Sequence, residues 1–157
     1  MFRVKEDNRL PSPQKEQVEK LEKFYRIAFP KEFKVFINEY NGAIPLNNTF
    51  EINGNEYVVE RFLCILGNLK NEYEEGWADI GVVISQIFDR LADDPNKLGM
   101  SIIPIAALFA GDYVCLDYRN NEVEPEVCIW YHEESAPFQP VTKKIANSFD
   151  EFLDILK

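Results

Sequence analysis

The chain has 157 residues, of which 46% are hydrophobic and 13% aromatic, and its formal net charge at pH 7 is −10. A chain of this length suits one domain, which can bury a sufficient core without a disulfide or a structural metal. Its N-terminus is polar and charged, so we expect no signal peptide there, and the sequence has no apolar run long enough to span a membrane. We therefore expect a cytoplasmic protein that does not bind a membrane.

The charges are distributed unevenly along the chain. Residues 1–34 contain nine Lys and Arg and six Asp and Glu, a net charge of +3, whereas residues 71–134 contain three basic and fourteen acidic residues, a net charge of −11. An acidic field repels phosphate groups, which argues against direct nucleic-acid binding by this segment, and it attracts a basic partner. The alternative is that the charge only keeps the protein soluble.

Four segments carry apolar residues at the i, i+3, i+4, i+7 spacing of an amphipathic helix. These predicted helices cover residues 13–28, 30–40, 79–93 and 148–156. Ser12 is expected to be the N-cap of the first helix, with Pro13 in its first turn, and Ser148 begins a capping box with Glu151 in the last helix. Asp79 is expected at the positive N-terminal end of the third helix.

Strands are predicted between these helices from short runs rich in β-branched and aromatic residues. They cover residues 49–52, 57–66, 101–108, 112–118 and 126–132. Asn53-Gly54 is a hairpin signal between the first two strands. The polar stretch at residues 67–76 is expected to be a loop.

The order of these elements predicts an α+β fold, because hairpins and strand pairs separate the helices. We expect one domain over residues 1–157, with a predominantly antiparallel sheet and about four helices packed around it. Its core is expected to cover about residues 12–157, after an irregular segment at residues 1–11.

The sequence contains no constellation that is typical of an enzyme. Asp112 and Asp117 are five residues apart on a predicted strand, so their side chains point to opposite faces, which is poor geometry for an acid–base pair. Phosphate-binding loops, dinucleotide-binding fingerprints and nucleophile elbows are absent. We therefore expect no catalytic activity and no cofactor.

The histidine and the cysteines do not predict a metal site. His132, the only histidine, has Glu133 as its neighbour, but adjacent side chains on a strand diverge, and no C-x-x-C pair is present. The cysteines Cys64, Cys115 and Cys128 lie in apolar runs. We expect them to be buried, protonated thiols in a reducing compartment.

Aromatic residues inside acidic stretches are the strongest binding signal. The stretch NEYEEGWADI, residues 71–80, places an aromatic pair among carboxylates, a combination suited to a partner rich in Arg and Lys. The candidate partner-binding residues are Glu72, Tyr73, Glu74, Glu75, Trp77, Asp79, Glu133 and Glu134. For Trp77 alone, the alternative is that its ring packs under the helix that follows.

An ordered set of segments resembles the SUKH superfamily, whose founding members include yeast regulators of cell-wall synthesis. The segments are FPKEFKVFINEYNGA (29–43), IIPIAALFAGDYVCLDY (102–118), PEVCIWYHEE (125–134) and IANSFDEFLDIL (145–156). The resemblance runs from about residue 18 to the last residue, and Phe29-Pro30 stands where the family usually has Leu-Pro. It implies an α+β domain without catalytic residues.

The resemblance also implies a function class. Bacterial members look like immunity proteins of polymorphic toxin systems, and eukaryotic relatives act as regulators or scaffolds. Together with the acidic charge, this favours an antitoxin that neutralises a cognate toxin, a nuclease such as an RNase encoded next to it, by covering its basic face. The alternatives are a regulatory or scaffold domain and, disfavoured by the carboxylate spacing, a hydrolase. A homodimer is compatible with the sequence.

Overall fold

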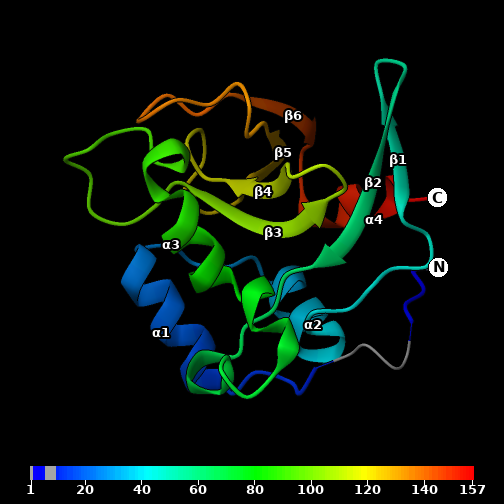
Figure 1. Ribbon diagram of the computed structural model, residues 1–157, viewed down its shortest axis with the longest axis vertical. Helices are drawn as coiled ribbons and strands as arrows, with labels where there is room; N and C mark the ends of the chain where they lie inside the picture. Colours follow the sequence, from blue (N-terminus) through cyan, green and yellow to red (C-terminus); the bar gives the residue numbers. More distant parts are fainter. Residues whose placement is uncertain (1, 6–9) are drawn as a thin grey trace.

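The computed structural model describes residues 2–5 and 10–157, with helices packed against a single sheet (Figure 1). The helices are α1 (Lys15–Tyr25), α2 (Lys31–Tyr40), α3 (Ile80–Leu91) and α4 (Phe149–Ile155), with two short 3-10 helices, η2 (Gly67–Leu69) and η3 (Glu74–Ala78). The strands are β1 (Thr49–Ile52), β2 (Asn55–Phe62), β3 (Ile102–Leu108), β4 (Tyr113–Asp117), β5 (Glu126–Trp130) and β6 (Thr142–Ala146). The predicted α+β class is confirmed.

The strands form one six-stranded sheet in the order β1-β2-β3-β4-β5-β6, and all neighbouring pairs are antiparallel. Each strand thus pairs with the next strand of the chain. Asn53 and Gly54 take φ values of +51° and +83° between β1 and β2, so the predicted hairpin turn is confirmed. Among residues 2–5 and 10–157, none of the helices is long and apolar enough to cross a membrane.

Aromatic rings fill the core between the sheet and helices α2 and α4. Phe36 of α2 contacts Phe62 of β2 and Phe149 of α4, with ring centroids 4.8 and 5.1 Å apart. Phe152 of α4 meets Phe50 of β1 edge to face at 5.6 Å. Such pairs contribute about 0.5–1.5 kcal/mol each beyond the area they bury. They hold the short helix α4 against the sheet.

Helix α3 packs against β3, all of whose residues are buried. The indole of Trp130 on β5 is also fully buried, and its N–H donates to the Arg90 carbonyl in the last turn of α3 at 3.0 Å. The Arg90 guanidinium lies 5.5 Å from the centre of the same ring, within the range of a cation–π contact. These contacts fix the C-terminal end of α3 beside the end of β5.

The start of α1 differs from the prediction. Its N-cap is Gln14, which forms a capping box inside the helix, and not Ser12. The Ser12 hydroxyl instead donates to the Asn38 carbonyl in α2, so Ser12 ties the segment that precedes α1 to α2. The helix also ends before residue 28, because Arg26 takes a left-handed φ of +57° after Tyr25.

Two further segments differ from expectation. Strand β6 was not predicted, since its sequence Thr-Lys-Lys-Ile-Ala lacks a clear alternation; exposed lysines are common on strands at the edge of a sheet. In the N-terminal segment, expected to be irregular, Val4 forms a bridge with Pro45, and Phe2 meets Phe36 at a centroid distance of 5.2 Å. Met1 and residues 6–9 of that segment lie outside the described residues.

Candidate functional site

Six of the eight candidate residues lie between β2 and α3, in residues 67–79, which we call the acidic loop (Figure 1). The ends of this loop meet, because Cys64 before it forms a parallel bridge with Asp79 at its end. The Cys64 N–H donates to the Ala78 carbonyl at 2.9 Å, and the Ile80 N–H donates to the Cys64 carbonyl at 2.8 Å. Compact surface loops with adjoining ends are Ω-loops, which are frequently functional.

The interior of the acidic loop is folded onto itself. The Glu72 N–H donates to the Leu69 carbonyl at 2.9 Å, and the Gly76 N–H donates to the Tyr73 carbonyl at 3.1 Å. A side chain at Gly76 would collide with the Lys70 carbonyl, so the loop closes this tightly only with glycine there. Tyr73 packs partly buried against the core. The loop therefore presents its outer side chains from a preformed backbone, which lowers the ordering cost of binding.

The loop carries three glutamates without an ion-pair partner in the described chain, together with one exposed lysine, Lys70. Glu72 and Glu74 are exposed and Glu75 is half-buried, and none of the three forms an ion pair within the described part of the chain. Trp77 is 46% exposed, so its ring does not pack wholly under α3. An exposed indole beside uncompensated carboxylates is suited to contact with a basic protein surface.

Asp79 has a different place from the other loop residues. It is only 5% exposed. One carboxylate oxygen accepts from the Leu66 N–H at 2.9 Å, and the other accepts from the Val82 N–H at 3.2 Å as the N-cap of α3. Its expected position at the helix start is confirmed. Because both carboxylate oxygens of Asp79 accept hydrogen bonds from backbone N–H groups, this side chain holds the loop in place and is not available at the surface.

The three cysteines are free and buried, as predicted. Burial, and next the Asp79 carboxylate, raise the pKa of the Cys64 thiol to about 12. Cys115 and Cys128 are opposite each other on β4 and β5, and burial also raises the pKa of the Cys115 thiol. Cys64 and Cys115 are therefore protonated near neutral pH and are poor nucleophiles.

The other two candidates, Glu133 and Glu134, are exposed in the β5–β6 loop, residues 131–141. His132 fixes the start of this loop. Its ring Nδ1 lies 2.6 Å from an Asp112 carboxylate oxygen that also accepts from the His132 backbone N–H at 2.9 Å. The His132 carbonyl accepts from the Arg90 guanidinium at 2.9 Å. His132 thus joins the β3–β4 turn, β5 and α3, a role that the sequence did not predict.

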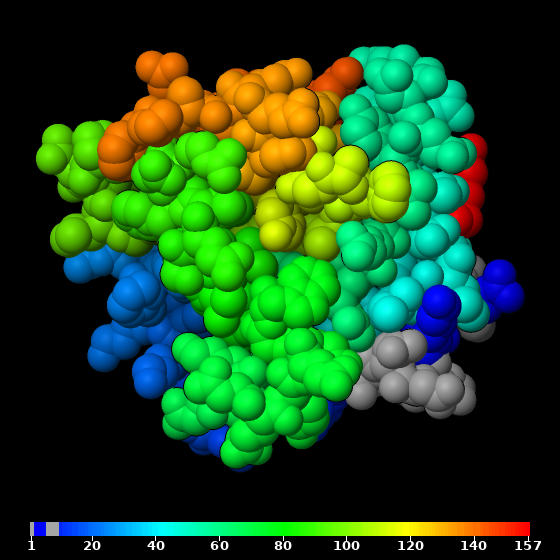
Figure 2. Space-filling view, viewed as in Figure 1, coloured from blue at the N-terminus to red at the C-terminus, as the bar shows by residue number. Residues whose placement is uncertain are grey.

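The two groups of candidates lie at opposite ends of α3. The acidic loop leads directly into the first turn of α3, whereas the β5–β6 loop contacts its last turn through Arg90. The twelve residues of α3 span roughly 18 Å at the rise of an α-helix. Figure 2 shows both segments on one face, the acidic loop at the bottom and the β5–β6 loop at the top. The eight candidates therefore fall into two separate groups, and Asp79 is buried within the first.

The carboxylates considered for catalysis are occupied by other contacts. Asp117 is 6% exposed and forms a two-point ion pair with the Arg119 guanidinium at 2.8 and 2.9 Å. Asp112 accepts from His132, as described above. Within residues 2–5 and 10–157, no group of three or more His, Cys, Asp or Glu side chains could hold a metal ion.

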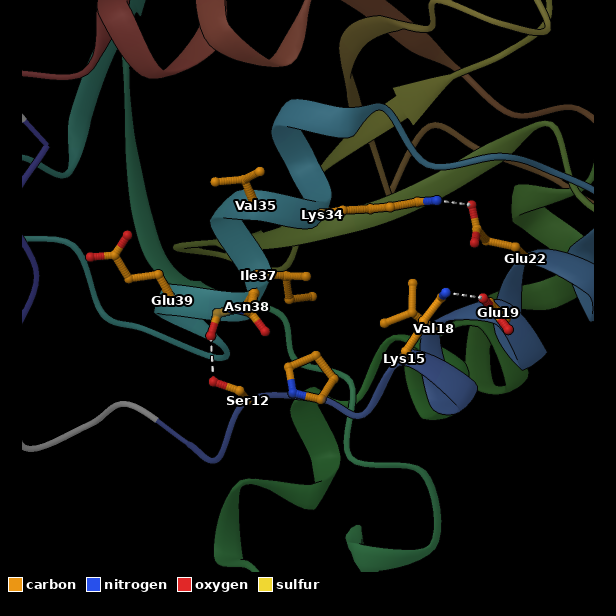
Figure 3. A pocket seen from close by; sticks show the side chains of 11 residues that line it. Ser12, Lys15, Val18, Glu19, Glu22, Lys34, Val35, Ile37, Asn38 and Glu39 are labelled. Atoms are coloured by element: carbon orange, nitrogen blue, oxygen red, sulfur yellow. Dashed lines mark hydrogen bonds and ion pairs between the residues drawn. The ribbon is translucent and has the colours of Figure 1, made fainter.

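Two grooves flank α1, and neither was predicted. The larger, of about 800 Å³, lies between α1 and α2 (Figure 3). Val18 and Ile37 line it, and an ion pair of 3.1 Å between Lys34 and Glu22 bridges the two helices. A second groove, of about 410 Å³, lies between α1 and the acidic loop. The charges of the larger groove largely compensate each other, so it offers less to a charged partner than the acidic loop does.

Comparison with known proteins gives two findings. A family model described as SMI1-KNR4 cell-wall (SUKH_6) matches residues 15–153. The chain is also 28% identical over 151 residues to the SPbeta prophage-derived uncharacterized protein YokK of Bacillus subtilis (strain 168), a match that covers 88% of this chain and 71% of that protein. The region matched by the family model contains the whole sheet and the acidic loop.

Proposed function

The chain belongs to the SUKH family, in a superfamily that contains toxin immunity proteins, and from this premise we propose that it binds and neutralises a toxin domain encoded next to it. The resemblance predicted from the sequence is thereby confirmed. The similarity to a Bacillus subtilis protein supports the bacterial branch of that resemblance. The observation that carries the proposal is the preformed acidic loop, whose Glu72, Glu74 and Glu75 have no ion-pair partner in the described chain.

The partner that fits this surface is basic. A nuclease must approach the phosphates of RNA or DNA, so its active face carries positive charge. An inhibitor with an acidic patch is steered toward that face, which raises the association rate by about 10- to 1,000-fold at low salt. Trp77 supplies an aromatic anchor beside the carboxylates. We therefore propose a nuclease toxin, such as an RNase, as the partner.

The proposed mechanism is occlusion and involves no chemistry on the toxin. The acidic loop would cover the basic face, and its closed backbone would keep the ordering cost of the complex low. Glu133 and Glu134, about one α3 length away, would meet the rim of a large partner or remain in solvent. Asp79 would act indirectly, by holding the loop.

The alternative is a regulatory or scaffold domain that binds a cellular protein. The acidic loop suits any basic protein surface, so the discriminating observation is the identity of the partner. Rescue of cells that express the neighbouring toxin supports the immunity function. Failure of rescue, together with stable binding of a non-toxin protein at the same loop, supports the scaffold alternative.

The test combines survival and binding kinetics with matched charge reversals. Glu72→Lys with Glu74→Lys should abolish protection and slow association with the toxin domain. The control is Glu51→Lys with Glu56→Lys on the β1–β2 hairpin, because it makes the same charge change at exposed positions of another element. If both double variants lose protection equally, the effect comes from net charge and the proposed surface is wrong.

A further inference from the structure

Two adjoining cavities lie beside α4, on a surface that the proposed function does not use. One, of about 450 Å³, lies between α2 and α4, and the other, of about 480 Å³, lies between α4 and the N-terminal segment at Phe2. Asp150 and Leu153 of α4 line both cavities, so the two form one groove, which we call the α4 groove. None of its described lining residues belongs to the acidic loop.

Helix α2 presents an apolar side chain between two carboxylates to this groove. Val35 is about one turn from Glu32 and from Glu39, and all three residues line the 450 Å³ cavity. The Val35 side chain is 60% exposed, whereas Phe36 beside it is buried in the core. In Figure 3, Val35 and Glu39 point away from α1, toward which Lys34 extends. The fold therefore leaves the Val35 side chain largely uncovered.

Helix α4 repeats this combination across the groove. Asp150 and Asp154 are one turn apart and exposed, and the half-buried Leu153 lies beside them. The buried side chains of Phe36 and Leu156 line one cavity each. The α4 groove therefore has an apolar floor and acidic sides.

The charges of the α4 groove are unbalanced. Its described lining residues include the four carboxylates of α2 and α4 and a single cationic side chain, Lys31. None of these five charged groups forms an ion pair within the described part of the chain. Arg3 follows Phe2 in the sequence but does not line either cavity. The groove therefore attracts a cationic partner and repels an anionic one.

We infer that the α4 groove binds a basic segment of another protein, in which an apolar side chain lies between cationic ones. The apolar side chain packs against Val35 and Leu153, and the flanking Lys or Arg side chains reach the carboxylates. Glu32 and Glu39 are separated by a rise of about 10 Å along α2, which matches cationic residues two turns apart on a facing helix. An amphipathic helix docks in such a groove by its apolar face.

This inference goes beyond the proposed function and does not rest on it. Because the α4 groove and the acidic loop share no described residue, one chain can hold a basic segment in the groove while the loop contacts a toxin. The same charge reversal at each of the two surfaces therefore separates the two proposals.

The experiment measures the binding of a fluorescent peptide to the full chain by anisotropy. The probe is a peptide of about 15 residues, made of Lys and of Leu at the i, i+3, i+4 spacing of a helix, and the control peptide has Glu in place of every Lys. The wild type should bind the lysine peptide and not the glutamate peptide.

The first variant reverses charge on both sides of the groove. Glu39→Lys with Asp154→Lys should weaken binding of the lysine peptide by about tenfold or more, because like charges then face each other. Both positions are exposed and lie near the C-terminal ends of their helices, where a cation is favourable. Circular dichroism should therefore be unchanged.

Two matched controls make the test specific to the groove. Glu72→Lys with Glu74→Lys changes the net charge equally at the acidic loop, and at 0.15 M ionic strength, where distant charges are screened, it should change the affinity by less than about threefold. Val35→Ser should weaken binding about threefold or more by removing an apolar contact. Val123→Ser, at a position 76% exposed in the β4–β5 loop, residues 118–125, should not.

The place of binding is read from amide chemical shifts of the chain during titration with the lysine peptide. The largest changes should occur at residues 31–40 and 149–156. Three results would overturn the inference. The first is the absence of saturable binding up to millimolar peptide. The second is equal weakening by both charge reversals, because binding would then follow net charge. The third is a set of shift changes centred on the acidic loop, because the peptide would then occupy that surface instead.

Discussion

Asp79 accepts a hydrogen bond from the backbone N–H of Leu66 at 2.9 Å, so the residue that caps α3 is tied to the residue that precedes the acidic loop. Its second oxygen accepts from Val82 inside α3. One buried carboxylate therefore fixes both ends of the loop relative to the helix. The loop that carries the proposed binding surface is positioned by this contact.

Replacing Asp79 should destabilise the fold and loosen the loop together. Asp79→Ala removes a helix N-cap, which costs about 0.5–2 kcal/mol, and leaves the buried Leu66 N–H without its acceptor, which costs about 1–3 kcal/mol. The free energy of unfolding from urea denaturation should fall by about 2–4 kcal/mol. Asp89→Ala, at an exposed position of α3, is the control and should change it by less than about 0.5 kcal/mol.

Gly76 should matter for the shape of the loop more than for the core. Because a Cβ at this position would overlap the Lys70 carbonyl, Gly76→Ala must push the two parts of the loop apart. Hydrogen exchange should become faster at the loop amides, whereas the strand amides of β3 and β4 should keep their protection. Unchanged exchange in the loop would mean that the backbone accommodates the methyl group, and that tight closure is not required.

The buried thiols predict a loss of stability in alkali. Burial raises the pKa of the Cys64 thiol from 9.0 to about 12. As the pH rises, this thiol therefore loses its proton at a lower pH in the unfolded chain than in the folded protein. The contribution of the protonated Cys64 thiol to the free energy of unfolding is fully present below pH 9 and is lost between pH 9 and about 12. The thermal midpoint should fall over this range, and Cys64→Ala should make the decline shallower; an equally steep decline would contradict the assignment.

The same burial predicts slow thiol chemistry. A thiol reagent at pH 8 should react slowly with the native protein. In denaturant, the same reagent should titrate three thiols per chain. Fewer than three groups after purification under reducing conditions would contradict the free state of the cysteines.

Asp112 should be a structural residue. It accepts from the ring and the backbone of His132, so Asp112→Ala should lower the free energy of unfolding by about 1–3 kcal/mol through an unsatisfied donor. At a temperature where the variant remains folded, protection against the toxin should be retained. Turnover of a nucleotide, peptide or glycoside by the wild type, lost in Asp112→Asn or Asp117→Asn, would contradict the non-enzymatic proposal.

Patterns within short segments predicted most of the fold. Stripes of apolar residues gave all four helices, and the Asn53-Gly54 pair gave the hairpin, because these signals are local. The N-cap of α1 is Gln14 and not the predicted Ser12, because the Ser12 hydroxyl donates to Asn38 of α2. No local sequence pattern contains this contact. Strand β6 was not predicted because its two lysines interrupt the apolar pattern that indicates a strand, and it pairs with a neighbour, β5, along only one edge.

The candidate surface was predicted only in part, for a similar reason. The acidic loop is continuous in sequence, so the sequence alone groups its carboxylates with Trp77. The separation of Glu133 and Glu134 from that loop depends on how α3 crosses the sheet. The contact between Asp112 and His132 depends on the register of β4 with β5, which sets Tyr113 opposite Trp130. Neither relationship is encoded within a single segment.

The aromatic residue and the carboxylates of the loop should affect toxin binding differently. Exposed charges act mainly on the association rate, and a covered aromatic ring acts mainly on dissociation. Trp77→Ala should therefore increase the dissociation rate with little change in association. Reversal of Lys15, Lys20 and Lys23 should not slow association with the toxin, because these residues lie on α1, outside the acidic loop.

The most direct test is the association rate with the neighbouring toxin domain as a function of ionic strength. The Debye length falls from about 30 Å at 0.01 M to about 8 Å at 0.15 M, so steering by the acidic loop should weaken over this range. We predict that the wild-type rate falls by about tenfold or more, and that Glu72→Lys with Glu74→Lys gives a slow rate that barely depends on salt. No binding, or a rate indifferent to both salt and the loop reversals, would contradict the proposed function.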